Sequence, residues 1–399
     1  MRIRTSIPAC VLLVVVWELL FGAPARVAGA QEVIGATAGP APVPEVDARS
    51  WVLSDAETGE VLGGENTFER LPMGSTDKMV VTLVALDAVA SGETSFEEEV
   101  TVSKKAASYA RPIYSNVGLR VGDSLSVKEL VAATLIASGN DASYALAEHL
   151  GGGGRVGVER FVAEMNRKVE ALGLEDTRFE NPTGLDARGQ YSSARDLAAI
   201  ARAGLEDPVF RGLVATDYTT ITTQDRAVEV ATTNELLGAY GPATGVKTGY
   251  TPGAGPCLVA SAVAEDEAYV SVVMGDEDRF PDSMRLLDYG FASYDRREVI
   301  VEGERYARAD VPYRRSEKID LVASEVVELL VDGAANVELK TEVSGELPDS
   351  AVPGTRLGRV VVVVDGKKSG ESPLVAKQGY GEASLVDRAW FTVEGIWAG

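Results

Sequence analysis

The feature that most constrains the fold of this chain is an apolar run from Met79 to Val89, which reads MVVTLVALDAV. The run is apolar on nearly every face of a helix, which is typical of a helix buried inside a domain. The chain has 399 residues, of which 45% are hydrophobic. This is enough material for the cores of two or three domains, and the run predicts the central helix of one of them.

Strand and helix patterns follow one another in a clear order along the chain. The stretch 50–66 predicts a hairpin around the turn DAETGE. Helical patterns then follow at 126–137, 141–150, 157–174 and 192–205. Strand patterns return at 245–251, 257–264 and 268–275, before a closing helix at 282–294. Strands early and late, with helices between them, predict an α+β fold.

Composition divides the chain into successive regions. Residues 31–47 are rich in Pro, Gly and Ala and are predicted to be a linker. Residues 48–296 carry the α+β pattern and are predicted to be the catalytic domain. Residues 297–386 are β-rich, with a Val-rich strand, an Asp365-Gly366 turn and a further strand, and predict a small second domain. Residues 387–399 are a short aromatic tail, shorter than the roughly 20 residues of a membrane-spanning helix.

The first thirty residues are predicted to be a signal peptide. Arg2 and Arg4 precede an apolar stretch, and the small residues Ala28 to Ala30 offer a cleavage site. Removal of this segment would leave Cys257 as the sole cysteine, which excludes an internal disulfide. We therefore expect a protein that is secreted or held at the cell envelope, on the outer face of the cytoplasmic membrane.

Charge and histidine content exclude several classes of function. The net charge of −22 argues against binding to nucleic acid, and against more than weak contact with a membrane. The single histidine, His149, lies at the end of a helical pattern without the G-x-S-x-G motif of a serine hydrolase. A single histidine also cannot form a histidine-rich zinc site. A G-x-G-x-x-G match at 152–157 follows a helix rather than a strand, and is not a dinucleotide-binding motif. No metal and no cofactor are expected.

The stretch STDK at the start of the apolar run points to a nucleophile. Ser75 and Lys78 are three residues apart, so both lie on one face of a helix. A serine hydroxyl needs a base to remove its proton, and a lysine becomes that base when burial lowers its pKa. The apolar run supplies such burial. S-x-x-K alone is a weak signal, and its alternative is a capping serine beside a solvent-reaching lysine.

Two further motifs strengthen this hypothesis. Ser138 and Asn140 stand in a tight SGN connection between two helices, and Lys247, Thr248 and Gly249 open a strand. The ordered motifs S-x-x-K, S-x-N and K-T-G resemble those of penicillin-binding proteins and serine β-lactamases. With the stretches ASGNDASYALAEHLGG, NPTGLD and GVKTGYT, the chain resembles the D-alanyl-D-alanine carboxypeptidases over roughly residues 50–294.

The resemblance implies a role for each motif. Ser75 would attack the bond between two terminal D-alanines of a peptidoglycan stem peptide, and Lys78 would take its proton. Ser138 would relay a proton to the leaving amine, and Asn140 would orient substrate amides. Lys247 and Thr248 would bind the substrate carboxylate, while backbone groups of Ser75 and Tyr250, which follows Gly249, would form an oxyanion hole. β-Lactam antibiotics would act as inhibitors.

The resemblance also implies an antiparallel sheet flanked by helices, with a helical subdomain. The chain departs from the family pattern at Asp77, where a less acidic residue is common, and at Tyr250, where a histidine is often found. We expect Asp77 to face outward, because adjacent helix residues point about 100° apart. An obvious amphipathic C-terminal anchor is also lacking.

Three alternatives remain open at this point: a β-lactamase, an endopeptidase on the same fold, or a non-enzymatic cell-wall-binding scaffold. The stretch RFENPTGLD lacks the Glu-x-x-x-Asn spacing of a β-lactamase deacylation site. The scaffold hypothesis is less well supported, because every position of the three motifs carries the expected residue.

Overall fold

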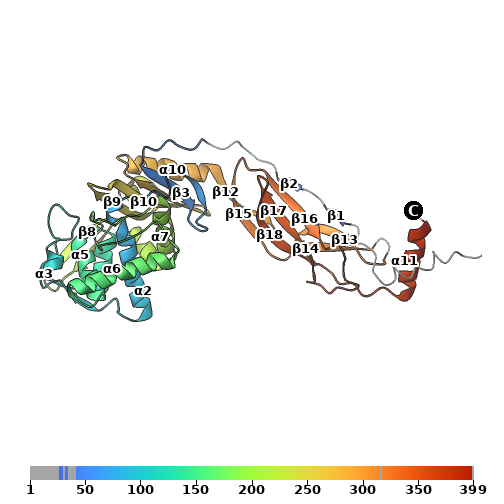
Figure 1. Ribbon diagram of the computed structural model, residues 1–399, viewed down its shortest axis with the longest axis horizontal. Helices are drawn as coiled ribbons and strands as arrows, with labels where there is room; N and C mark the ends of the chain where they lie inside the picture. Colours follow the sequence, from blue (N-terminus) through green and yellow to red (C-terminus); the bar gives the residue numbers. More distant parts are fainter. Residues whose placement is uncertain (1–26, 30–31, 35–41, 315–316, 398–399) are drawn as a thin grey trace, which may run out of the picture. The chain divides into compact units, whose positions relative to one another are not determined.

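The computed structural model describes residues 27–29, 32–34, 42–314 and 317–397 (Figure 1). It divides into two compact units, residues 41–292 and a second unit of residues 1–40 with 293–399. Most of the predicted signal peptide and part of the predicted linker lie outside the described residues. The described parts of those segments form the short strands β1 (Val27–Gly29) and β2 (Glu32–Ile34).

The unit of residues 41–292 is built on a five-stranded antiparallel sheet with the strand order β4-β3-β11-β10-β9. These strands are β3 (Ser50–Asp55), β4 (Val61–Glu65), β9 (Ala243–Thr251), β10 (Gly255–Ala264) and β11 (Glu267–Met274). The predicted hairpin and the three predicted late strands are all present. The pairing of an early hairpin with late strands confirms the α+β prediction.

Helices cover both faces of this sheet. On one face, α10 (Arg279–Ser293) packs through Phe291, whose ring centroid lies 4.9 Å from that of Tyr269 on β11. On the other face, alternate residues such as Val259 and Val272 join the core formed by the helices. Both sets of strand residues are buried, as expected for a sheet that lies between two helical layers.

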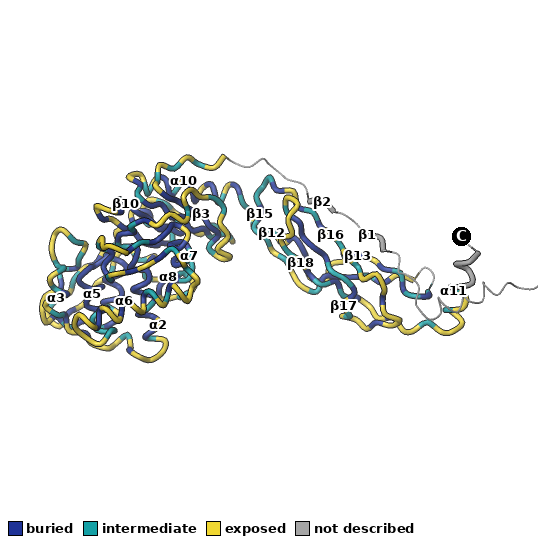
Figure 2. The backbone as a smooth tube through the Cα atoms, in the orientation of Figure 1, coloured by how far each residue is buried: buried dark blue, intermediate teal, exposed yellow. Residues whose placement is uncertain are grey.

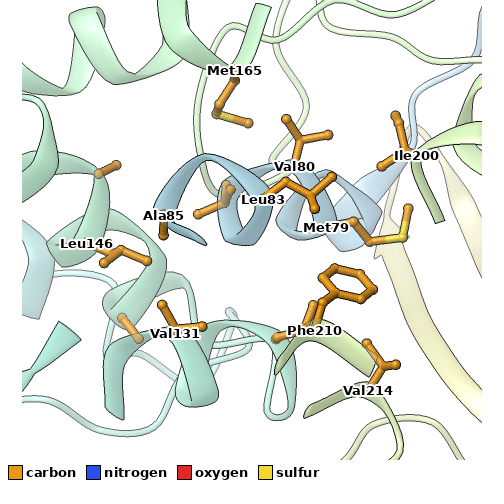
Figure 3. Close-up of a cluster of buried hydrophobic side chains, with 14 of the residues drawn as sticks. Met79, Val80, Leu83, Ala85, Val131, Leu146, Met165, Ile200, Phe210 and Val214 are labelled. Atoms are coloured by element: carbon orange, nitrogen blue, oxygen red, sulfur yellow. The ribbon is translucent and has the colours of Figure 1, made fainter. Parts of the chain in front are cut away.

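The apolar run forms the central helix α2 (Lys78–Ser91). Figure 3 shows its side chains surrounded by residues of other helices. These helices are α4 (Val127–Leu135), α5 (Asn140–Leu150), α6 (Gly154–Ala171), α7 (Ala194–Glu206) and α8 (Pro208–Val214). Met79, Val80 and Ala85 are all fully buried. The prediction of a helix buried inside a domain is confirmed, while Asp87 and the last turn of the helix reach the surface.

Smaller elements complete this unit. They are the 3₁₀ helix η1 (Gly74–Asp77) and the helices α3 (Lys104–Ala107) and α9 (Leu236–Ala239). There are also two two-stranded antiparallel sheets, β5 (Glu99–Thr101) with β6 (Ser124–Ser126) and the hairpin of β7 (Tyr218–Thr222) with β8 (Ala227–Ala231). Buried residues run along the sheet and α2, whereas exposed residues gather in the outer loops (Figure 2). Ser126 and Glu129 form a capping box at the start of α4.

The second unit is β-rich, as expected from the sequence. Its seven-stranded sheet has the order β1-β13-β14-β18-β17-β16-β2, and β12 pairs with β15 in a separate ladder. The strands are β12 (Tyr294–Ile300), β13 (Arg305–Asp310), β14 (Lys318–Ala323), β15 (Val327–Asp332), β16 (Val337–Val343), β17 (Arg356–Val364) and β18 (Lys367–Ala376). It has a hydrophobic core of its own.

The helix α11 (Leu385–Trp397) contains the described part of the aromatic tail, and the sequence patterns did not predict it. Phe391 packs edge-on against Tyr313, with ring centroids 5.9 Å apart, and Arg388 pairs with Asp349 at 2.8 Å. The start of the tail therefore packs against its own unit. Within the described part of the chain, no helix has the length and apolar character needed to cross a membrane.

Candidate active site

Ser75 and Lys78 meet where η1 passes into α2. Lys78 Nζ lies 2.9 Å from Ser75 Oγ and donates a hydrogen bond to the carbonyl oxygen of Thr183 at 2.7 Å. The lysine is fully buried, while Ser75 is half-buried and can be reached from outside. In η1 the backbone makes about three residues per turn, which stacks residues three apart on one face. The structure thus brings this predicted pair together.

Burial decides the protonation state of Lys78. The loss of hydration disfavours the ammonium form and lowers the pKa of Lys78 to about 8, against the opposing attraction of Asp77 and Asp141. An amine with a pKa near neutrality is neutral in a useful fraction of molecules at pH 7–8. Lys78 is therefore chemically competent to take a proton from Ser75.

The SGN motif forms the connection between α4 and α5. Ser138 has a left-handed backbone with a φ of 58°, and Asn140 is the first residue of α5. Both side chains are buried, yet Ser138 Oγ and Asn140 Oδ1 have no hydrogen-bond partner among the described residues. Buried polar atoms are normally paired in folded proteins. Two orphaned atoms within one motif indicate groups that are held ready for a ligand.

Asp141, the residue after the SGN motif, binds the backbone of a neighbouring segment. Its carboxylate accepts hydrogen bonds from the backbone N–H groups of Val117 and Leu119, the latter at 2.9 Å. Its charge also acts on Lys78. On the same helix, Ser143 Oγ donates to the carbonyl oxygen of Pro182, the residue before Thr183. Helix α5 is thereby linked to the segment that holds Lys78.

The KTG motif lies on β9, at the edge of the sheet, and this strand packs directly against η1. A Cβ atom added to Gly249 would come within 2.5 Å of the carbonyl oxygen of Met73, and one added to Gly74 would come within 2.6 Å of Tyr250 N. Glycine is therefore required on both sides of the contact. The close approach brings the backbone beside Ser75 next to the backbone N–H of Tyr250.

Lys247 is buried beside Lys78. Burial, together with the positive charge of Lys78, lowers the pKa of Lys247 to about 7. The hydroxyl of Thr248 lies 2.5 Å from that of Thr233. Tyr250, by contrast, is 65% exposed, so its contribution to the site is its backbone rather than its ring. Lys78 is thus linked electrostatically to Lys247 of the KTG motif and to Asp141, the residue that follows the SGN motif.

The expectation that Asp77 faces outward is wrong. Asp77 is fully buried, and its Oδ1 lies 3.9 Å from Lys78 Nζ. The carboxylate lies against Gly184, where an added Cβ atom would come within 2.6 Å of Oδ1. Burial raises the pKa of Asp77 to about 6, while the charges of Lys78 and Lys247 oppose this shift.

Sequence reasoning missed the part played by the turn that contains Thr183 and Gly184. The Thr183 carbonyl of the NPTG stretch holds Lys78, and its Gly184 makes room for Asp77. A backbone carbonyl leaves no side-chain signal in a sequence. The positive φ of Gly184, 71°, is the one feature that a glycine in a turn could have suggested.

His149 lies away from this chemistry. Its Nε2 is 3.0 Å from a carboxylate oxygen of Glu98, near the end of α5. Within the described residues, no group of three or more histidine, cysteine, aspartate or glutamate side chains could hold a metal ion.

Comparisons with known proteins cover both units. A family model described as D-alanyl-D-alanine carboxypeptidase matches residues 36–278. A second model, described as the C-terminal domain of penicillin-binding protein 5, matches residues 294–382. The carboxypeptidase DacF of Bacillus subtilis is 33% identical over 352 residues, which cover 85% of this chain and 87% of that protein. The carboxypeptidase DacC of Escherichia coli is 32% identical, with coverages of 87% and 88%.

Solved structures show the same likeness. Penicillin-binding protein 5 from Haemophilus influenzae is 30% identical and has a TM-score of 0.68, with 86% of this chain and 100% of that chain covered. The Streptomyces K15 DD-transpeptidase is 31% identical and has a TM-score of 0.59, with 63% of this chain and 100% of that chain covered.

Proposed function

This chain belongs to the D-alanyl-D-alanine carboxypeptidase family, and from this premise we propose that Ser75 is the nucleophile with which it removes a terminal D-alanine. The chain is a serine-type carboxypeptidase of the penicillin-binding group. The observation that carries the residue assignment is the 2.9 Å distance from Ser75 Oγ to the buried Lys78 Nζ. The family match favours this activity over a β-lactamase or a scaffold.

In the proposed reaction, Ser75 Oγ attacks the carbonyl carbon between two D-alanines while Lys78 takes its proton. The carbonyl electron pair moves onto the oxygen, which the backbone N–H groups of Ser75 and Tyr250 stabilise. A donor of this kind is typically worth about 3–4 kcal/mol. The C–N bond then breaks, the last D-alanine leaves, and an acyl-enzyme remains on Ser75 until water hydrolyses it.

The remaining site residues hold the substrate and move protons. Ser138 Oγ, which has no partner among the described residues, would pass a proton to the leaving amine. Asn140 would bind a substrate amide through its free oxygen. Lys247 and Thr248 would bind the terminal carboxylate, and Gly249 lets the strand approach Ser75. A negative ligand at this site would favour the charged form of Lys247.

The substrate that we propose is the stem peptide of peptidoglycan, and β-lactams would be inhibitors. The strained amide of a β-lactam would lie where the scissile peptide lies, and its carboxylate would meet Lys247. We further propose that the protein works outside the cytoplasmic membrane after removal of residues 1–30, with at most weak membrane contact. Fractionation that leaves the protein in membranes after high-salt and carbonate washes would overturn this placement.

The test uses both the substrate and the inhibitor. Mass spectrometry of products from purified muropeptides should show loss of one D-alanine. Intact-mass analysis with penicillin should show one covalent adduct, and this adduct should be absent from Ser75→Ala. Folding of the variant can be checked by its thermal unfolding. A folded Ser75→Ala protein that still carries the adduct would show that another residue is the nucleophile.

A further inference from the structure

The residue before the proposed base carries a charge that the reaction described so far does not use. Asp77 is fully buried and its Oδ1 is 3.9 Å from Lys78 Nζ. This distance is too long for a direct hydrogen bond and short enough for a strong electrostatic interaction between two buried side chains. A buried aspartate in this position needs an explanation.

Apart from the two lysines, the groups around Asp77 do little to compensate its negative charge. No hydrogen bond to either carboxylate oxygen meets the usual geometry among the described residues. The backbone N–H groups of Gly184 and Lys78 favour its ionised form, but the larger attractions come from the side chains of Lys78 and Lys247. The carboxylate is therefore directed at the two lysines of the site.

We propose that Asp77 is a positioning residue that acts through Lys78, because its buried carboxylate stabilises the ammonium that Lys78 becomes on taking the proton of Ser75. The inference rests on the proposed function, in which Ser75 is acylated and Lys78 is its base. Serine, lysine and aspartate then form a three-member arrangement in which a third group supports the base.

The proton balance of the step is simple. As the bond from Ser75 Oγ to the carbonyl carbon forms, the proton moves from Oγ to Lys78 Nζ and the carbonyl electron pair moves onto oxygen. Lys78 becomes positively charged inside the protein, and Asp77, with a pKa of about 6, stays ionised throughout the step at pH 7 and above. When the C–N bond breaks, the proton passes on to the leaving amine and Lys78 is neutral again.

The charges that face Lys78 determine the size of this effect. Asp77 on η1 and Asp141 on α5 stabilise the ammonium, and Lys247 on β9 opposes it. From the turn before Gly184, Lys78 meets only the carbonyl oxygen of Thr183. Asp141 is already held by the backbone N–H groups of Val117 and Leu119. Asp77 lies 3.9 Å from Lys78 Nζ, and the backbone N–H groups near its carboxylate do not reach hydrogen-bond geometry, so its charge is less compensated than that of Asp141.

A charge that stabilises the ammonium has two opposite consequences for the rate. It makes Lys78 a stronger base, which speeds proton transfer when the lysine is neutral. It also keeps a larger share of Lys78 protonated at low pH, which slows the reaction there. Replacement of Asp77 by the isosteric asparagine should therefore change the rate in opposite directions at the two ends of the pH range.

The experiment measures the rate of acylation by penicillin in the full chain and in Asp77→Asn, from pH 5 to 10. In the variant, we expect the midpoint of the rising limb to move down by about one pH unit and the limiting rate at high pH to fall roughly three- to tenfold. The two profiles should cross, so that the variant is faster at low pH. The control is Asp87→Asn, which removes an exposed carboxylate from α2 and should leave the profile unchanged.

Each other outcome decides the question. A rate that falls by one factor at every pH, with no movement of the midpoint, would reduce Asp77 to a structural role and overturn the proposal, as would an unchanged profile. If Asp77→Asn does not fold, Asp77→Thr gives the same comparison with a smaller neutral side chain. Peptide mapping of the adduct separates the two hypotheses. An adduct outside Ser75 would reject the proposed function, and an adduct on Ser75 with an unshifted profile would reject only the role of Asp77.

Discussion

Two buried lysines share one site, and their different tasks predict different responses to arginine. In the proposed mechanism, Lys78 must lose its proton to act as the base, whereas Lys247 needs only its positive charge to bind the substrate carboxylate. Arginine keeps its proton at every accessible pH. Lys78→Arg should therefore reduce acylation by penicillin by at least about 10²-fold, the lower range of general-base contributions. Lys247→Arg should keep partial activity.

The pKa of Lys78 predicts how the acylation rate should change with pH. Because burial lowers the pKa of Lys78 to about 8, acylation by the unaltered chain should rise as the pH passes through about 8. It should level off well below 10.4, the ordinary value for lysine. Rates for both variants across pH 6–10 check this. A Lys78→Arg protein with near-normal rates would mean that the base lies elsewhere.

At the level of single residues, motif spacing predicted which side chains meet, but it did not predict side-chain orientations that depend on the folded backbone. Ser75 and Lys78 are three residues apart and meet as expected. The orientation of Asp77 could not be predicted, because it depends on the 3₁₀ geometry of η1 and on the space beside Gly184. Gly184 lies more than a hundred residues further along the chain, where no local pattern refers to Asp77.

At the level of elements, the close contact between η1 and β9 predicts that one added methyl group at Gly74 reduces the acylation rate. Gly74 has a φ of 56°, and an added Cβ atom would come within 2.6 Å of Tyr250 N. Gly74→Ala should push β9 away from η1 and misplace the backbone donors of the oxyanion hole. Loss of one such donor typically costs about 10²–10³ in rate. Acylation of Gly74→Ala by penicillin should therefore fall by about 10²-fold.

Gly92 offers a matched control for this prediction. It ends α2 with a φ of 79°, and an added Cβ atom would have no neighbour within 4 Å. Gly92→Ala introduces the same backbone strain without the clash, so it should cost about 1 kcal/mol of stability and leave acylation unchanged. Thermal unfolding and acylation rates of both variants are the measurements. Equal acylation rates in the two variants would contradict the role given to the contact between η1 and β9.

Elements were predictable where burial imposes a pattern. The helix α2 is apolar on nearly every face and β9, β10 and β11 are largely buried strands, so their sequences carried strong signals. The hairpin of β7 and β8 was not predicted, because each strand buries a single side chain, Ile221 or Val230, among exposed and half-buried neighbours. The helix α11 was not predicted either, because several of its apolar side chains, including Leu385, Val386 and Trp390, are exposed and burial imposes little pattern on them.

At the level of the whole molecule, the two units have separate hydrophobic cores. One core comprises residues between Val52 and Met274, and the other comprises residues between Val299 and Tyr380. A unit that buries its own core can in principle fold alone. Every residue proposed for catalysis or substrate binding, from Ser75 to Tyr250, belongs to the unit of residues 41–292. The chemistry and the β-rich unit are therefore separable on structural grounds.

This separation predicts the behaviour of a shortened chain. Residues 31–296, which contain the whole unit of residues 41–292, should unfold cooperatively and release D-alanine from a stem-peptide analogue at a rate close to that of the full chain. The reason is that no proposed step uses a group beyond Tyr250. The same shortened chain with Ser75→Ala should unfold alike and release nothing, which separates loss of chemistry from loss of folding. A shortened chain that unfolds cooperatively yet releases no D-alanine would show that the β-rich unit takes part in catalysis.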